Sequence, residues 1–393
     1  VIRMLYYSCL SIFFLLGVIK NEIVKNMKST FLIFLIIFLF CFSYQMGIDW
    51  ISYQDLYENI ALKLTWDQII TQYIGSERGY VIVNMFFYNL GFNYELFMAL
   101  ILGTCSFIIL NFIKKKSKNY YLSFYFFLII FFMSALLEPL VRQVIALTFF
   151  IVGIKYIERK NFLKYVLIII LAAQFHRTAY LLIPLYFIKN FKFSMKKIIL
   201  MIFSFKILLE YILILILYIL PKYSVYLNEI KYMSKGGTSL ITIVMGCYYL
   251  YVEFYAYKFS RRFQSYILNF ASLYIIIELI TAYFPILGRM NLYFAPFISI
   301  TISYIGDLHY VNKRKINLFR GKWNNIILVI FSFIMSTTMF YRRVVTNELS
   351  SFTYLNYKNY IIEFIKGDLK NSFLEKSEEY KKKFDEILEK ENL

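Results

Sequence analysis

Two segments of the chain place an arginine at the start of an apolar helix, directly after a turn. In EPLVRQVIAL, Pro139 makes the turn, and Arg142 and Gln143 begin the helix. In FPILGRMNLYF, Arg289 holds the same position. Free backbone N–H groups and a guanidinium point the same way at such a site, which favours binding of a phosphate. For either arginine taken alone, contact with lipid headgroups is the alternative.

A third segment, AAQFHRTAYLLIPLYF at residues 172–187, carries His176 and Arg177 inside an apolar run. With Arg177 beside it and Thr178 after it, at the predicted outer level of the other two arginines, His176 is a candidate functional residue. A buried core histidine is the alternative. We expect no cofactor and no metal, because His309 lies in a different predicted loop and no ligand cluster occurs.

The elements that must position these residues are membrane-spanning helices. The chain has 393 residues, 60% of them hydrophobic, and its mean hydropathy is +0.60. Apolar blocks of roughly 18–22 residues, the length that crosses a bilayer, alternate with short polar loops. The predicted fold class is therefore all-α: a polytopic membrane protein with about 12 transmembrane helices. The expected spans are 4–19, 29–46, 93–113, 119–137, 140–157, 162–175, 177–189, 198–219, 239–257, 263–284, 290–306 and 323–341.

The basic residues mark one side of the membrane. Six segments at every second loop hold 23 of the 43 Lys and Arg but only three acids. This positive-inside pattern makes them cytoplasmic and places both termini outside. The net charge of +19 therefore reflects topology and needs no nucleic-acid partner. The six segments are 20–28, 114–118, 155–164, 189–197, 258–262 and 307–322.

Two outer loops and a tail complete the predicted organisation. A transmembrane domain, 1–345, carries outer loops at 47–78 and 221–239, and a mixed-charge amphipathic helical tail, 346–393, follows it. The tail could lie on the bilayer or bind a partner, and an even span count would place it outside. The apolar segment 79–91 is too short for a span, so we expect an interfacial or re-entrant helix there.

Charged residues gather at the predicted outer ends of the spans. Because intramembrane charges are costly, these residues are functional candidates by default. The pair of spans 162–175 and 177–189 is too short for two full crossings. They form either two tilted half-length helices or one broken helix, with the His-Arg turn near the outer face in both cases. The outer group comprises Asp49, Glu77, Arg78, Glu138, Arg142, His176, Arg177 and Arg289.

Five motifs, in order and at similar spacing, make the chain resemble the EpsG-type, Wzy-like polysaccharide polymerases. They are GIDWISY, ERGYVIVN, RQVIAL, FHRTAYLLIPLYF and GRMNLYF, and the resemblance covers about residues 4–345. In one departure, FSYQMGID lacks the arginine that such proteins often carry before the G-x-D. The resemblance implies a GT-C-like fold in the bacterial inner membrane. It also implies a metal-independent enzyme that joins undecaprenyl-diphosphate-linked oligosaccharide units into capsule, exopolysaccharide or O-antigen outside the cytoplasm.

Such a reaction assigns roles to the outer residues. Fixed cations would stabilise the leaving diphosphate, and Arg142 and Arg289 are the candidates, with His176 or Asp49 as base. The implied partners are the lipid-linked glycan, membrane lipid, a flippase and a chain-length regulator. Aromatic rings of the outer loop could stack on sugars. The predicted substrate-binding residues are Arg177, Gln143, Tyr53, Glu77, Tyr293 and Trp50.

Two other readings stay open. A lipid-linked oligosaccharide flippase would also have about 12 helices, but it should show a polar cavity through the whole membrane. A GT-C-type glycosyltransferase or ligase would share the chemistry, and the sequence does not separate it from a polymerase.

Overall fold

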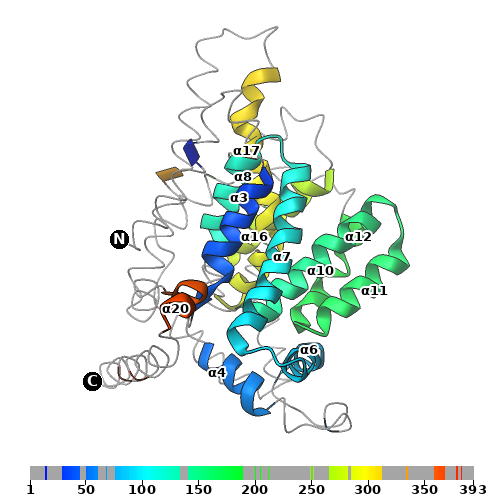
Figure 1. The fold of residues 1–393 in the computed structure, drawn as a ribbon. Helices are drawn as coiled ribbons and strands as arrows, with labels where there is room; N and C mark the ends of the chain where they lie inside the picture. Colours follow the sequence, from blue (N-terminus) through cyan, green and yellow to red (C-terminus); the bar gives the residue numbers. More distant parts are fainter. Residues whose placement is uncertain are drawn as a thin grey trace, which may run out of the picture. The chain divides into compact units, whose positions relative to one another are not determined.

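The computed structural model describes a helical chain that divides into two compact units (Figure 1). Unit 1 comprises Val1–Lys115, Leu128–Ile183 and Ser336–Leu393, and unit 2 comprises Lys116–Phe127 and Pro184–Met335. The described residues are 14–15, 29–44, 50–60, 68, 76–132, 140–188, 200, 204, 211, 248, 251, 265–281, 285–311, 333–334, 358–367, 378 and 382.

Unit 1 holds most of the described helices and a two-residue strand pair. They are α3 (Ser29–Ile36), the π-helical η1 (Ile37–Cys41), β1 (Ser43–Tyr44), α4 (Trp50–Asp55), the π-helical η2 (Leu56–Ile60), α6 (Arg78–Asn89), α7 (Tyr94–Lys116), the π-helical η3 (Leu128–Phe132), α10 (Val141–Glu158), α11 (Phe162–Ala173), the 3₁₀ helix η4 (Arg177–Leu182), β2 (Lys358–Asn359) and α20 (Tyr360–Lys366).

Unit 2 is built on α8 (Tyr120–Phe127), α16 (Ser265–Thr281) and α17 (Asn291–Val311), with α12 (Leu185–Ile188) and the 3₁₀ helix η6 (Pro285–Met290). Helix α17 packs against both α16 and α8. A buried hydrogen bond from the Asn291 amide to the Glu278 carboxylate ties the start of α17 to α16. The hydroxyls of Ser123 and Ser303 bond at 2.6 Å and link α8 to α17.

The predicted all-α class is confirmed, since helices dominate the described residues and the strand pair is minimal. Among the described helices, α7 alone is both long and apolar enough to cross a membrane by length and composition. The count of about 12 spans stays a prediction, because the expected spans 4–19, 198–219, 239–257 and 323–341 lie almost wholly outside the described residues.

Helices α10, α11 and η4 form a helical hairpin with a break at residues 174–176. Asn161 is the N-cap of α11. Its side-chain oxygen accepts a hydrogen bond from the Lys164 amide at 3.0 Å, which satisfies a free N–H group of the first turn. The Tyr165 hydroxyl donates to the Leu182 carbonyl at 2.6 Å, so the chain folds back on α11 after residue 176. A single helix would separate these residues by about 25 Å. The His-Arg turn therefore joins two short antiparallel helices.

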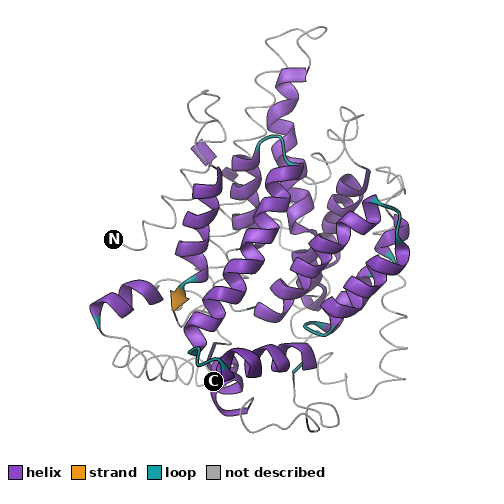
Figure 2. Ribbon diagram, turned by 45° about the vertical axis from the view of Figure 1, so that its right-hand side comes forward, coloured by secondary structure: helices purple, strands orange, loops and turns teal. Residues whose placement is uncertain are grey.

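Helices α4 and α6 lie at the end of unit 1 that the sequence places outside. Figure 1 shows α7 upright and α6 nearly end-on near its lower end, and Figure 2 shows α6 along its length, so α6 runs across α7. The Tyr57 hydroxyl donates to the Phe92 carbonyl at 2.8 Å, just before α7 begins. A 12-residue helix spans about 18 Å, so α6 is shorter than a full crossing, as expected for 79–91, and its interfacial or re-entrant placement stays a prediction.

The tail segment that contains β2 and α20 is bound to the start of the same outer region. Strand β2 pairs antiparallel with β1, and the Tyr360 amide donates to the Phe42 carbonyl at 2.8 Å. Asn359 is buried, and its amide donates to the Phe38 carbonyl at 3.0 Å while its oxygen accepts from the Ile361 amide. This part of the tail therefore lies beside the end of η1, shortly before the predicted outer loop 47–78.

This pairing predicts the membrane side of the tail. Single cysteines would replace exposed Ile365 in α20 and exposed Glu58 in η2, in a chain whose native cysteines are changed to serine. An impermeant maleimide should label both from outside intact cells. Arg159→Cys, in the turn between α10 and α11, is the opposite-side control and should react only after permeabilisation. If the cysteine at position 365, like the one at position 159, reacts only after permeabilisation, the strand pairing is contradicted.

Candidate functional site

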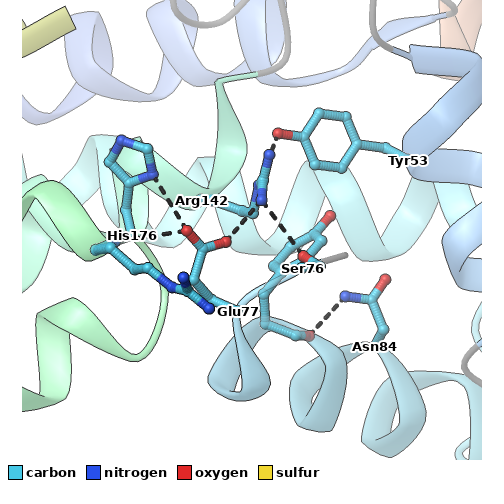
Figure 3. A network of polar contacts seen from close by, with 8 residues as sticks. Tyr53, Ser76, Glu77, Asn84, Arg142 and His176 are labelled. Atoms are coloured by element: carbon cyan, nitrogen blue, oxygen red, sulfur yellow. Dashed lines mark hydrogen bonds and ion pairs between the residues drawn. The ribbon is translucent and has the colours of Figure 1, made fainter. Parts of the chain in front are cut away.

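The candidate site is a group of charged side chains around Glu77, at the start of α6 (Figure 3). One carboxylate oxygen accepts a hydrogen bond from Arg142 Nη1 of α10 at 2.6 Å. The other lies 3.7 Å from His176 Nδ1 and 3.5 Å from the Arg177 amide nitrogen. Glu77 thus joins the start of α6 to the start of α10 and to the break after α11.

A close backbone approach makes this arrangement possible. The Gly79 amide donates to the Gln174 carbonyl at 3.0 Å, which brings the first turn of α6 against the last turn of α11. A Cβ on residue 79 would lie 2.8 Å from that carbonyl oxygen and 2.9 Å from Gln174 Cβ. Only glycine fits at this distance. The approach places Glu77, two residues earlier, beside His176 and Arg177.

The surroundings of Glu77 keep it ionised. Its side chain is 12% exposed. Burial alone would raise the pKa of the carboxyl, but the His176 imidazole, the Arg142 guanidinium and its own backbone amide outweigh burial and lower the pKa to about 2. Hydrogen bonds and positive charge favour the charged form in this way. Glu77 is therefore a fixed negative charge at neutral pH.

Arg142 is held on a second side by Tyr53 of α4. Its Nε donates to the Tyr53 hydroxyl at 3.1 Å, and its guanidinium carbon lies 5.5 Å from the centre of the Tyr53 ring. The Ser76 hydroxyl accepts from Nη1 at 3.5 Å. The Arg142 side chain keeps 31% of its surface exposed. Arg142 is thus fixed in place by Glu77 and Tyr53 but still reaches the surface.

His176 and Arg177 differ in exposure. Both ring nitrogens of His176 are buried and make no hydrogen bond to the described residues, although Nδ1 lies 3.7 Å from the Glu77 carboxylate. Arg177 is exposed, with its backbone turned toward Glu77. An imidazole whose Nδ1 faces a carboxylate can take a proton at Nε2, and the exposed guanidinium beside it can bind an anion. The arrangement therefore suits removal of a proton from a ligand by His176 while Arg177 binds a negatively charged part of the ligand.

A comparison with known protein families agrees with this reading of the chain. The family model described as "EpsG family" matches residues 26–359. The chain belongs to the EpsG family. No curated protein and no solved structure matches it. The chain is thus a membrane protein of polysaccharide biosynthesis, and the resemblance found in the sequence is confirmed.

The other predicted site residues of this EpsG-family protein lie in different surroundings. Gln143 follows Arg142 on α10 and is buried. Trp50 and Tyr53 are 3% and 8% exposed, so their rings offer little surface for stacking on a sugar. In unit 2, Arg289 is the last residue but one of η6 and is exposed, whereas Tyr293 of α17 is fully buried. Asp49 lies outside the described residues.

Sequence reasoning missed the part that Gly79 and Ser76 play. A glycine in the first turn of an otherwise apolar helix, directly after two charged residues, is a signal for a close backbone contact. The structure also buries the Tyr80 hydroxyl and the Asn84 side-chain oxygen, for which the described residues offer no hydrogen-bond partner. Among the described residues, no group of three His, Cys, Asp or Glu side chains is placed to hold a metal.

Replacing Glu77 with glutamine should change how stability depends on pH. Because the pKa of Glu77 is lowered, its contribution is full above about pH 4.5 and is lost as the pH falls toward 2, by an amount on the order of 3 kcal/mol. E77Q should therefore unfold more easily at pH 7 and lose less stability between pH 5 and 2. Thermal unfolding in detergent measures both effects. E158Q, at the exposed far end of α10, is the control, and equal pH profiles for wild type and E77Q would refute the charge network.

Replacing Gly79 with alanine should separate α6 from α11. The added methyl group meets backbone atoms that cannot turn aside, so we expect a loss of about 1–3 kcal/mol in unfolding free energy. The matched control is Gly103→Ala in α7, where a Cβ meets only a methyl group of Ile37 at 3.3 Å. Chemical denaturation compares the two, and a G79A variant as stable as G103A would contradict the close approach.

Proposed function

We propose that this EpsG-family protein is a polymerase of lipid-linked glycans. It joins undecaprenyl-diphosphate-linked oligosaccharide repeat units into a capsular, exopolysaccharide or O-antigen chain at the outer face of the bacterial inner membrane. The observation that carries the proposal is the convergence of Arg142, His176 and Arg177 on Glu77 at one end of unit 1. Family membership supports the same class of function. About 12 spans and a GT-C-like fold belong to the proposal.

The proposed reaction is a glycosyl transfer. A sugar hydroxyl of one lipid-linked unit attacks the anomeric carbon of the growing chain, and a new C–O bond forms. The bond between that carbon and the diphosphate oxygen breaks, and the lipid diphosphate leaves with the bonding electrons. The hydroxyl proton moves to the His176 imidazole. Proton removal by a positioned base typically accelerates such a step about 10²–10⁴-fold.

Two kinds of charge serve this reaction. The Glu77 carboxylate stabilises the imidazolium that forms when His176 takes the proton, as a buried acid does beside a catalytic histidine. Exposed Arg177 stabilises the negative charge that grows on the diphosphate, and the part of Arg142 that stays exposed beside Glu77 adds to the positive charge there. Glu77 is in this scheme a positioning residue, because it fixes Arg142 and the turn that carries His176. Arg289 is the corresponding candidate in unit 2.

Product length tests this proposal directly. Purified protein in lipid nanodiscs, given a synthetic undecaprenyl-diphosphate repeat unit, should form a ladder of longer products on a gel. H176Q should lower the rate of elongation by about 100-fold or more. R177A and R289A should lower it as well, whereas R159A, in the predicted cytoplasmic turn, should not. If folded H176Q elongates the glycan at the wild-type rate, His176 is not the general base.

The same assay separates the alternatives. A ligase would transfer one block to a different acceptor, and a GT-C-type monosaccharide transferase would add one sugar. A flippase would move labelled lipid-linked glycan across vesicles without making a longer product. Any of these patterns in place of a ladder would overturn the polymerase assignment.

A further inference from the structure

Helix α6 has a stripe of exposed side chains that its packing leaves uncovered. Its inner face is formed by Tyr80, Val81 and Asn84, which are fully buried. The opposite face carries Ile82, Phe86 and Leu90, exposed at 38%, 59% and 57%. These residues recur every fourth position, so they form one slanted stripe along the helix. Both faces of α6 thus carry large apolar side chains, but only one of them packs against other described residues.

The stripe begins at a charged end. Arg78 is exposed and lies four residues before Ile82, in line with the stripe. Glu77, the residue before Arg78, contacts the amide of Arg177, whose side chain is also exposed. One end of the apolar stripe therefore lies next to Arg78 and near the turn that carries Arg177, and Leu90 at the other end lies about 18 Å from Arg78.

We propose that the stripe Ile82–Phe86–Leu90 binds the first part of the isoprenyl chain of the lipid diphosphate donor, with the diphosphate against Arg78 and Arg177. This rests on the proposed function and assigns a subsite to it. Two guanidinium groups followed by an apolar strip match a lipid with a doubly charged head. The contact would explain why a helix that lies across α7 keeps large apolar side chains exposed.

The orientation of α6 favours this occupant over ordinary bilayer lipid. Helix α11 exposes Leu163, Leu167 and Leu171 along its length, as expected of a helix that faces the membrane. Helix α6 instead lies across the outer ends of the unit 1 helices and starts at Glu77, beside His176 (Figures 1 and 3). A lipid whose head reaches this cluster meets the stripe within one turn of α6.

A binding experiment with two chain lengths tests the subsite. Wild type and F86Q/L90Q would be placed in neutral phosphatidylcholine nanodiscs and titrated with undecaprenyl diphosphate and with water-soluble geranyl diphosphate. The affinity of the double variant for undecaprenyl diphosphate should fall at least about tenfold. Its affinity for geranyl diphosphate should fall by less than about twofold. L163Q at the far end of α11 is the matched control and should bind both like wild type. R78Q/R177Q should weaken both ligands.

The outcomes separate the subsite from the proposed function. If wild type binds undecaprenyl diphosphate and F86Q/L90Q binds it equally well, the subsite is wrong while the proposed function stands. Displacement by phosphatidylglycerol as effective as by undecaprenyl diphosphate would also overturn it, since the stripe would then take any anionic lipid. If wild type binds no lipid diphosphate, both ideas fail.

Photocrosslinking gives a readout that needs no variant. An undecaprenyl diphosphate with a diazirine in its first isoprene units should label peptides that contain residues 78–90 of the wild-type protein. Labelling confined to α11 or to other helices would contradict the subsite.

Discussion

The buried carboxylate of Glu77 is the interaction on which the candidate site depends. A charge removed from water is stable only when ionic and hydrogen-bonding partners compensate it. Glu77 finds these partners on two other elements, in Arg142 at the start of α10 and in the turn of His176 and Arg177 after α11. The positions of all three helix ends are therefore coupled through one side chain.

Backbone packing makes that coupling possible, because a glutamate side chain is short. Glu77 reaches the His-Arg turn only because Gly79 lets α6 approach the Gln174 carbonyl. The break after α11 is the second requirement, since a continuous helix would have used the Arg177 backbone amide internally, as the His176 amide still is in its bond to the Ala172 carbonyl. The amide of Arg177 instead faces the carboxylate. A glycine and a helix break, both local features, thus create a long-range ionic contact.

Local sequence patterns predicted many of the helices and the membrane face at which the candidate site lies. They did not predict which side chains contact one another there. Apolar length and loop charge predicted helices near 29–46, 93–113 and 140–157, and the structure has helices there. The same patterns placed Arg142 and His176 at one face. They did not reveal that Glu77 joins them, because partners 65 and 99 residues away leave no local signal. The pairing of β2 with β1, which lie more than 300 residues apart in the sequence, was not predicted for the same reason.

The charge balance of the group indicates what kind of ligand it suits. The negative charge of Glu77 compensates that of Arg142, with which it bonds at 2.6 Å. Arg177 and Arg78 then remain as exposed positive groups beside a buried imidazole. A neutral sugar would gain little from two such guanidinium groups, whereas a diphosphate would bind both. The surplus of positive charge next to a potential base is what a transfer from a lipid diphosphate requires, and it arises because one carboxylate neutralises only one of three arginines.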